Sequence, residues 1–286
     1  MNLAKPIAVP PEASRAPAAD LKSLTLPAVP QAVMTLMDML RSGRTAVDQI
    51  AREIERDPSL ASRVVGMANS PMFARRRKVA SIQDAIRFLG TATLRTLVVG
   101  AGMQAAFVKV PGVDLSTFWS DATTAAQAAR GLARLVGADG EAAYLAGLLH
   151  SAGHLILCNG LPARAAGLKP SRPPLRGAAL ANLERTRFGL THAAVGGLWL
   201  RQMGMAVEVV EAVGHYLDGD ARTMPQLARI VCAASSIAEA LDLGEDDASA
   251  LARLCSLPWW PAGIGLVDTG PVVELLAELR EPPADD

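Results

Sequence analysis

Apolar residues in the first part of the chain recur with the period of an α-helix. A first set spaced i, i+3, i+4, i+7 predicts a helix that ends at Gly43, and a second set with the same stripe predicts another helix. The two sets are Val33, Leu36, Met37 and Leu40, then Val47, Ile50, Ala51 and Ile54. Asp57-Pro58 supplies an N-cap and a first-turn proline, so a third helix is expected from there.

The same reading continues along the chain. Ser81 begins a capping-box spacing with Asp84, Gly90 suits a left-handed helix end, and Thr91 can cap the next helix. Further helices are expected at about 117–136, 141–149, 175–188, 192–202, 205–217 and 224–242. The proline-rich segment 159–174 is expected to be a long loop. Strand-like alternation is nearly absent, so the predicted fold class is all-α.

These elements suggest two helical lobes rather than a solenoid of equal repeats. Residues 1–21 read as a flexible leader, and 22–217 as the main domain. Within it, a first helical bundle at about 24–110 precedes a second lobe at about 111–217. Residues 218–286 are expected to form a helical extension that packs on the second lobe.

Composition narrows the class of protein. Half of the 286 residues are apolar, which is enough for a substantial core, and 28 basic residues balance 28 acidic ones. No segment reads as a secretory signal or a membrane span, so a cytoplasmic location is expected. Cys158, Cys232 and Cys255 are too scattered for a disulfide framework or a zinc ribbon, and we expect them to be reduced and mostly buried.

The most informative chemistry is the pair His150-Ser151, which looks like a metal-hydrolase signature that has lost its carboxylate. An Asp directly after the His would hold a divalent cation and help to acidify its bound water, and neutral Ser151 cannot do so.

Several motifs in order carry a family resemblance. They are Leu26-Pro27-Ala28-Val29-Pro30, Asp57-Pro58-Ser59-Leu60, Ala68-Asn69-Ser70, Ala85-Ile86-Arg87-Phe88-Leu89-Gly90, Phe118-Trp119, Ala146-Gly147-Leu148-Leu149-His150, Glu184-Arg185 and Thr191-His192 with Val195-Gly196. On these motifs the chain resembles the HDOD family, the HD-related output domains of bacterial signalling proteins. The resemblance implies an all-helical regulatory domain whose second lobe is similar to the HD phosphohydrolase superfamily, usually without a working metal centre.

The superfamily ligands carry over only in part. Asp121 lies where an early histidine is expected, His150 matches the motif histidine, and His192 and His215 fall near later histidines. Ser151 and Ser235 stand where carboxylates are expected. His154 replaces what is often a lysine, and Tyr216 follows His215 where a second histidine is common.

Two interpretations of these residues remain. His150, His192 and His215 could hold one zinc, with Asp121 restoring a charge. The interpretation we favour is a set of hydrogen-bonded polar residues in a helical core, and a small-molecule pocket is a third possibility. His154 is one turn from His150, but Gly153 suggests a bend between them. His215 suits a helix C-terminus, Thr191 suits an N-cap, and Glu184 could cap a neighbouring helix, pair with an arginine or act as a base.

Two other segments stand out. Arg75-Arg76-Arg77-Lys78 could contact phosphate or nucleic acid, although a solvated loop is the simpler interpretation. Trp259-Trp260 either packs back on the core, which we favour, or marks a partner site.

The sequence therefore predicts a non-catalytic signalling domain that acts by binding another protein, with no catalytic residue, metal or cofactor assigned. The rival is a metal-dependent HD-type phosphohydrolase acting on a nucleotide or cyclic dinucleotide. A nucleotide- or RNA-sensing module is a third reading, which zero net charge disfavours. The partner and the oligomeric state stay open.

Overall fold

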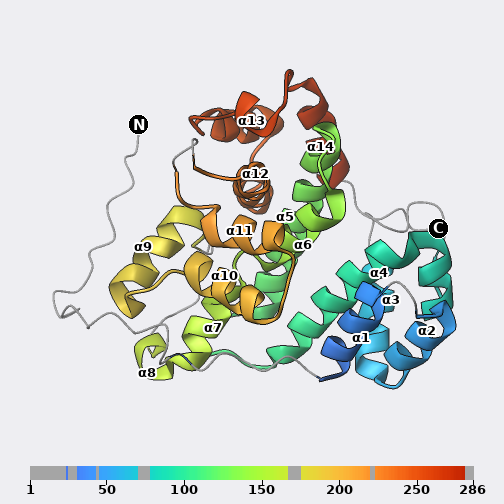
Figure 1. The fold of residues 1–286 in the computed structure, drawn as a ribbon. Helices are drawn as coiled ribbons and strands as arrows, with labels where there is room; N and C mark the ends of the chain where they lie inside the picture. Colours follow the sequence, from blue (N-terminus) through green and yellow to red (C-terminus); the bar gives the residue numbers. More distant parts are fainter. Residues whose placement is uncertain are drawn as a thin grey trace.

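The chain folds into helices throughout the part that the structure describes. This computed structural model describes Leu24 and residues 31–42, 45–69, 78–166, 175–219 and 223–280, and none of these residues lies in a strand (Figure 1). The all-α prediction is confirmed. The predicted leader, residues 1–21, and the basic residues Arg75, Arg76 and Arg77 lie outside the described residues.

The expected helices are present in the predicted order, with small changes at their ends, and the helices at 152–160 and 162–165 were not predicted. In chain order they are α1 (Gln31–Ser42), α2 (Val47–Glu55), α3 (Pro58–Ala68), α4 (Ile82–Ala106), α5 (Leu115–Leu135), α6 (Gly140–Leu149), α7 (Ala152–Gly160), α8 (Pro162–Ala165), α9 (Gly177–Phe188), α10 (His192–Gln202), α11 (Val207–His215), α12 (Gln226–Asp242), α13 (Asp247–Cys255), the 3-10 turn η2 (Ala262–Ile264) and α14 (Gly270–Arg280).

Polar side chains at the ends of α3 stabilise the first lobe. The Asp57 carboxylate accepts hydrogen bonds from the backbone amides of Ser59 and Leu60, at 2.9 and 3.1 Å, and starts α3. Asn69 ends α3, and its amide exchanges two hydrogen bonds with the backbone of Val79, at 2.7 and 2.8 Å. Because one side chain holds both ends of the intervening segment, α3 and α4 keep a fixed relation.

α4 connects the two lobes. Gly90 lies inside it with φ 77° and ψ 172°, so the helix breaks there and restarts at once, as the glycine and Thr91 had suggested. The helix packs against α1, α2 and α3, and also against α6 of the second lobe.

Close helix contacts shape the second lobe. Gly147 brings α6 against α5, where an added Cβ would lie 2.8 Å from the Cα of Ala126. At Gly153 an added Cβ would overlap the backbone oxygen of His192, so α7 and α10 cross with their backbones nearly touching. Larger residues at either position would force the helices apart.

The turn expected between His150 and His154 is present, because α6 ends at Leu149 and α7 begins at Ala152, but it lies at His150-Ser151 and not at Gly153. Gly153 lies within α7, where its missing side chain provides room for α10. The expectation of a loop at 159–174 was wrong in part: α7 continues to Gly160, and Pro162 begins the short helix α8 at its first turn. Residues 167–174 lie outside the described part of the chain.

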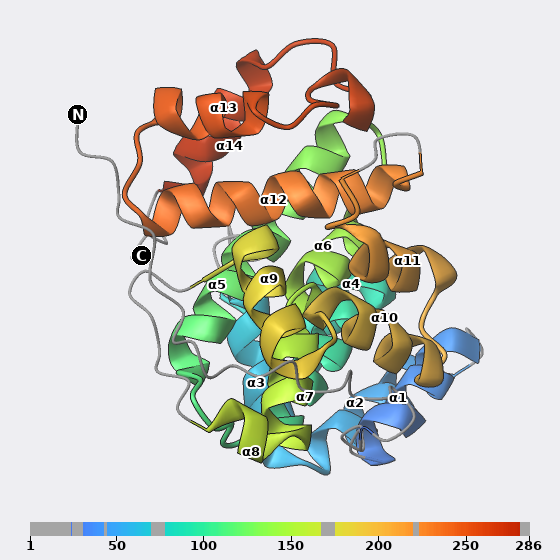
Figure 2. The ribbon, with the colours of Figure 1, turned by 90° about the vertical axis from the view of Figure 1, so that its left-hand side faces the viewer.

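The C-terminal helices cover one side of the second lobe. α12 lies across α5, α6 and α11, with α13 and α14 beyond it (Figure 2). Trp259 and Trp260 are buried in the core, with exposed fractions of 6% and 9%, which confirms that this pair packs inward. The expectation of mostly buried cysteines was wrong, because only Cys158 is buried; Cys232 is intermediate, and Cys255 is exposed at the end of α13, where little packs over it.

Within the described residues, we find no helix whose length and apolarity would let it cross a bilayer.

Candidate functional site

The His150-Ser151 pair lies at the junction of α6 and α7. His150 is the C-cap of α6 and Ser151 precedes the first residue of α7. The Ser151 side chain makes no capping hydrogen bond to that helix. The motif is therefore a sharp helix-to-helix turn that directs His150 into the second lobe, where it is 7% exposed.

Glu184 of α9 is the centre of the polar cluster, and it is completely buried. One carboxylate oxygen accepts from the backbone amide and from Nδ1 of His192, at 2.7 and 2.6 Å, and the other accepts from Nδ1 of His154 at 2.8 Å. Burial would raise the pKa of Glu184, but His192 and His154 outweigh it and lower the pKa. The carboxylate thus caps the N-terminus of α10, as one sequence interpretation proposed, and binds two imidazoles.

His192 is held at both ring nitrogens. Thr191 caps α10 as expected, its hydroxyl accepting from the amide of Ala194 at 3.3 Å, and so places His192 in the first turn. Because Nδ1 of His192 faces a carboxylate, it carries a proton, and Nε2 forms a hydrogen bond with the Tyr216 hydroxyl. Burial raises the pKa of Tyr216 well above its usual value, so the hydroxyl keeps its proton.

His154 and Cys158 extend the cluster along α7. Nε2 of His154 lies 3.6 Å from the Cys158 sulfur, and its Nδ1 faces Glu184. Burial would lower the pKa of His154, but Cys158 and Glu184 together raise it. Thiol, imidazole and carboxylate are in the order of a nucleophilic triad, yet the Cys158 side chain is completely buried, so a substrate in solution cannot reach its sulfur.

His150 is a neutral base inside the lobe. Its Nδ1 lies 2.6 Å from the backbone oxygen of Gly147, so this nitrogen carries the proton. Burial lowers the pKa of His150 to about 4, although its hydrogen bond to the Gly147 carbonyl opposes the change. The rings of His150 and Tyr216 pack edge to face, with their centres 5.3 Å apart.

Arg176 joins two carboxylates beside this cluster. Its guanidinium forms ion pairs with Asp121 of α5 and with Asp242, the latter at 3.0 Å, and its side chain is 9% exposed. Burial raises the pKa of Asp121, although Arg176 opposes the change. The Asp121 carboxylate is therefore already paired with an arginine.

His215 lies apart from the other histidines. It is the last residue of α11, its side chain is 51% exposed, and its Nδ1 lies 2.6 Å from the Asp218 carboxylate. Ser235, on α12, is buried at 6% exposure. The structure thus brings His150 and His192 onto the ring of Tyr216, but it does not bring His215 to them.

The donor set does not fit the divalent cation that an HD-type site implies. Both nitrogens of His192 have protein partners, Nδ1 of His150 is bonded to a carbonyl, and Asp121 faces a guanidinium. Among the described residues, no three histidine, cysteine or acidic side chains converge as metal ligands. A cation would have to displace several existing hydrogen bonds.

Sequence reasoning missed two members of this region. Arg176 falls at the start of the helix expected at 175–188 and is the N-cap residue of α9, and nothing in its local sequence marks it as the partner of Asp121. Cys158 follows His154 by four residues, a spacing that places two side chains on one helical face once α7 is known to be a helix.

Comparison with known proteins agrees with this fold. The HDOD domain family model matches residues 26–218. A protein of Shewanella amazonensis, described as a candidate phosphohydrolase, is 30% identical with a TM-score of 0.74, covering 91% of this chain and 93% of that one.

Two further structures share the fold. An HDOD domain protein of unknown function from Geobacter sulfurreducens is 22% identical, with a TM-score of 0.61, over 90% of this chain and 93% of that one. A candidate signal transduction protein of Marinobacter aquaeolei is 26% identical, with a TM-score of 0.62, over 91% of this chain and 57% of that one. Among curated proteins, none matches the chain.

Proposed function

Since the chain belongs to the HDOD domain family, we propose that it is a non-catalytic regulatory domain of signal transduction that acts by binding another protein. The family match and the signalling description of the Marinobacter relative support the regulatory role. Whether the domain is also catalytic depends on the histidine cluster around Glu184 in the second lobe.

The observation that carries the non-catalytic part is that the acidic and imidazole groups of that cluster are already held by partners within the protein. Glu184 accepts three N–H groups, His192 uses both ring nitrogens, and Arg176 holds Asp121, although Nε and Nη1 of Arg176 are buried without an acceptor among the described residues. A reaction centre needs groups that are free to meet a substrate or a metal-bound water. Here these polar side chains hold α7, α9, α10 and α11 together instead.

The replacement of the motif aspartate by Ser151 also supports a non-catalytic role. Ser151 adds no negative charge, and the one carboxylate inside the cluster, Glu184, is already balanced by two histidines. A divalent cation at His150 would therefore be poorly compensated in a buried site.

Metal titration tests this proposal. Isothermal titration of the chelator-treated protein with Mn²⁺ and with Zn²⁺ is expected to show no stoichiometric site. The matched control is the double variant His150→Ala, His192→Ala, which is expected to give the same baseline. One equivalent of metal bound by the wild type and lost in the double variant would overturn the non-catalytic reading.

The rival function is an HD-type phosphohydrolase, which the description of the Shewanella relative favours. It predicts metal-dependent release of phosphate from a nucleotide, or opening of a cyclic dinucleotide, that the double variant abolishes. The regulatory proposal predicts none above the rate of the double variant. Cross-linking in the source cell, followed by recombinant reconstitution of the cross-linked pair, tests the binding part, and failure to reconstitute any pair would contradict it.

A further inference from the structure

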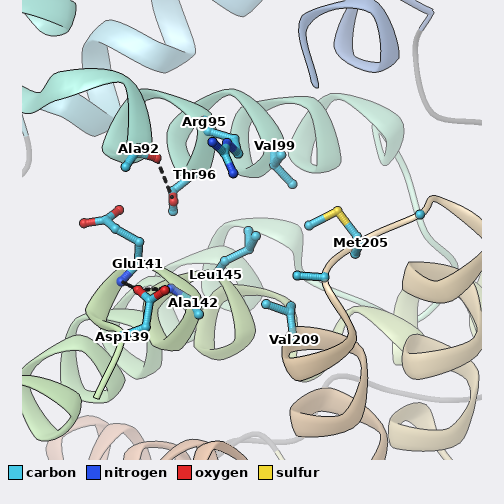
Figure 3. Close-up of a pocket in the computed structure, with 12 residues that line it drawn as sticks. Ala92, Arg95, Thr96, Val99, Asp139, Glu141, Ala142, Leu145, Met205 and Val209 are labelled. Carbon is cyan, nitrogen blue, oxygen red and sulfur yellow. Dashed lines mark hydrogen bonds between the residues drawn. The ribbon is translucent and has the colours of Figure 1, made fainter. Parts of the chain in front are cut away.

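Two arginines of the second lobe have side chains that are almost withdrawn from solvent, with exposed fractions of 10% for Arg130 and 9% for Arg176. Arg130 of α5 pairs with Glu141 at 2.6 Å. This pair lies beside the interlobe cavity, an open space of about 440 Å³ between α4, the first half of α6 and the connection from α10 to α11 (Figure 3). Arg176 lies instead beside the histidine cluster, and it pairs with two carboxylates.

Three helices meet at the Arg176 guanidinium. Arg176 is the N-cap residue of α9, and its Nη2 forms ion pairs with Asp121 of α5 and with Asp242, the last residue of α12. The two carboxylates are 21% and 35% exposed, so solvent compensates them only in part. Because like charges that share one point repel each other, these carboxylates need a cation between them.

His150 lies within range of the same positive charge. Burial, His192 and Arg176 lower the pKa of His150, and the hydrogen bond to the Gly147 carbonyl opposes them. Asp121 and His150 fall at two of the positions where the family resemblance expects metal ligands. The positive charge next to these two positions is therefore that of an arginine.

Arg229 of α12 shows a different use of a partly buried arginine. Its Nε and Nη2 both donate to the backbone oxygen of Met224, at 3.1 and 2.8 Å, and its Nη1 donates to the backbone oxygen of Gly263. All three nitrogens are used, so the planar shape of the guanidinium matters there. In Arg176, Nη2 serves both carboxylates, whereas Nε and Nη1 are buried without an acceptor among the described residues. What the position of Arg176 requires is therefore charge rather than a planar set of donors.

We propose that Arg176 is a built-in cation, which supplies from within the chain the positive charge that an HD-type site takes from a divalent ion. It balances Asp121 and Asp242 and so holds α5, α9 and α12 together. The inference rests on the proposed non-catalytic role and deepens it, because it names the group that replaces the metal charge. A charge that belongs to the chain cannot exchange with solution, whereas a bound ion can.

Substitutions at Arg176 separate charge from shape. Thermal unfolding of the full chain at neutral pH is the measurement. Arg176→Lys keeps the charge and Arg176→Met removes it, so the drop in the unfolding midpoint should be about twice as large for Arg176→Met. Arg229 is the matched control, because its donors and not its charge are used. Arg229→Lys and Arg229→Met should lower the midpoint by similar amounts.

A second substitution at Asp121 gives a reversal of sign that a purely steric role would not produce. In the wild type, Asp121→Asn breaks an ion pair and should lower the midpoint. In Arg176→Met the carboxylate has lost its cation, so the same change should raise the midpoint. The control is Asp247→Asn, which removes a carboxylate paired with Arg280 and should have the same effect in both backgrounds.

Equal losses for Arg176→Lys and Arg176→Met would overturn the built-in cation, and so would an Asp121→Asn effect of the same sign in both backgrounds. If Arg176→Met alone does not fold, recovery of folding on adding Asp121→Asn supports the proposal, and a double variant that also fails to fold overturns it. Metal titration of the wild type tests the non-catalytic role separately. Absence of a metal site together with equal Arg176→Lys and Arg176→Met losses would leave that role standing and reject only the built-in cation.

Discussion

The histidine cluster and the interlobe cavity both gather charged side chains, but they differ in how those groups are satisfied. In the cluster, Glu184 is wholly buried and each of its oxygens accepts an imidazole N–H. In the cavity, Glu141 shares one oxygen between Arg130 and Thr93 and leaves the other without a donor among the described residues. The first arrangement stabilises the fold, whereas the second leaves one buried carboxylate oxygen unsatisfied.

This difference reverses what the motif suggested. The residues that resemble a reaction centre are the ones tied most firmly to each other, and the cavity lies where no chemical motif was recognised. Chemical residue types indicate what a site could do, but their remaining hydrogen-bonding capacity decides what they can bind.

The strongest test of the contrast is Glu184→Ala. Removing this carboxylate leaves the amide and ring of His192 and the ring of His154 buried without their acceptor, so the free energy of unfolding should fall by about 4 kcal/mol. Urea unfolding at neutral pH measures it. Glu208→Ala, an exposed residue of α11, is the control and should cost less than about 0.5 kcal/mol. Similar losses in both variants would remove the distinction between the cluster and an ordinary surface.

The pH dependence of stability tests the buried neutral His150. The folded state lowers its pKa from 6.5 to about 4, so the unfolded chain binds more protons between these values. Wild-type stability should therefore decrease as pH falls from 6.5 to 4, and His150 should account for about 3 kcal/mol of that decrease. His192 and Arg176 are the ionisable neighbours that, after burial, also lower this pKa, and the hydrogen bond to Gly147 opposes them.

His150→Gln removes this titration while keeping a polar side chain of similar length. Chemical unfolding at a series of pH values should give a shallower slope for the variant between pH 6.5 and 4. Identical slopes would show that His150 is solvated, and would contradict its burial in the histidine cluster.

Gly153→Ala probes how closely α7 and α10 approach at the cluster. An added methyl group would overlap the backbone oxygen of His192, and the helices must separate, at a cost of about 2 kcal/mol. Gly66→Ala in α3 is the matched control, since nothing lies within 4 Å of its new Cβ, and it should stabilise the helix by about 0.5–1 kcal/mol. Thermal unfolding compares the two, and a Gly153→Ala protein as stable as wild type would contradict the tight crossing.

Tyr216→Phe removes one hydroxyl from the cluster and leaves the ring contacts in place. Nε2 of His192 then loses its hydrogen-bond partner, and the loss of unfolding free energy should be about 1.5 kcal/mol. Urea unfolding is the measurement. An unchanged free energy of unfolding would mean that this hydrogen bond between the hydroxyl and the imidazole contributes nothing to stability.

The smallest expected effect lies at the cavity. Ala92→Trp adds a whole indole, but into open space, so the free energy of unfolding should change by less than about 0.5 kcal/mol. Thermal unfolding checks it beside Gly153→Ala. If the added indole cost more than the added methyl, the cavity would be as tightly packed as the cluster.

Much of the fold could be predicted because its signals are local. Helical periodicity and caps such as Asp57, Ser81 and Thr191 act within one or two turns, and the structure has these helices in the expected order. The sequence is less informative where a distant segment decides the local role. The turn between His150 and His154 was expected, but it was attributed to Gly153, whose partner, the backbone of α10, is about forty residues away in the sequence.

The sequence by itself determined the all-helical fold, the HDOD resemblance and the replacement of the motif aspartate by Ser151. Only the tertiary structure decided that Glu184 forms hydrogen bonds with both His154 and His192. It also decided that Arg176 forms an ion pair with Asp121, and that His215 lies outside the cluster. The physical reason is that hydrogen bonds and ion pairs depend on distances between helices, which follow from packing of the whole chain. A residue's type gives its chemistry, and its neighbours in the fold decide whether that chemistry is already used.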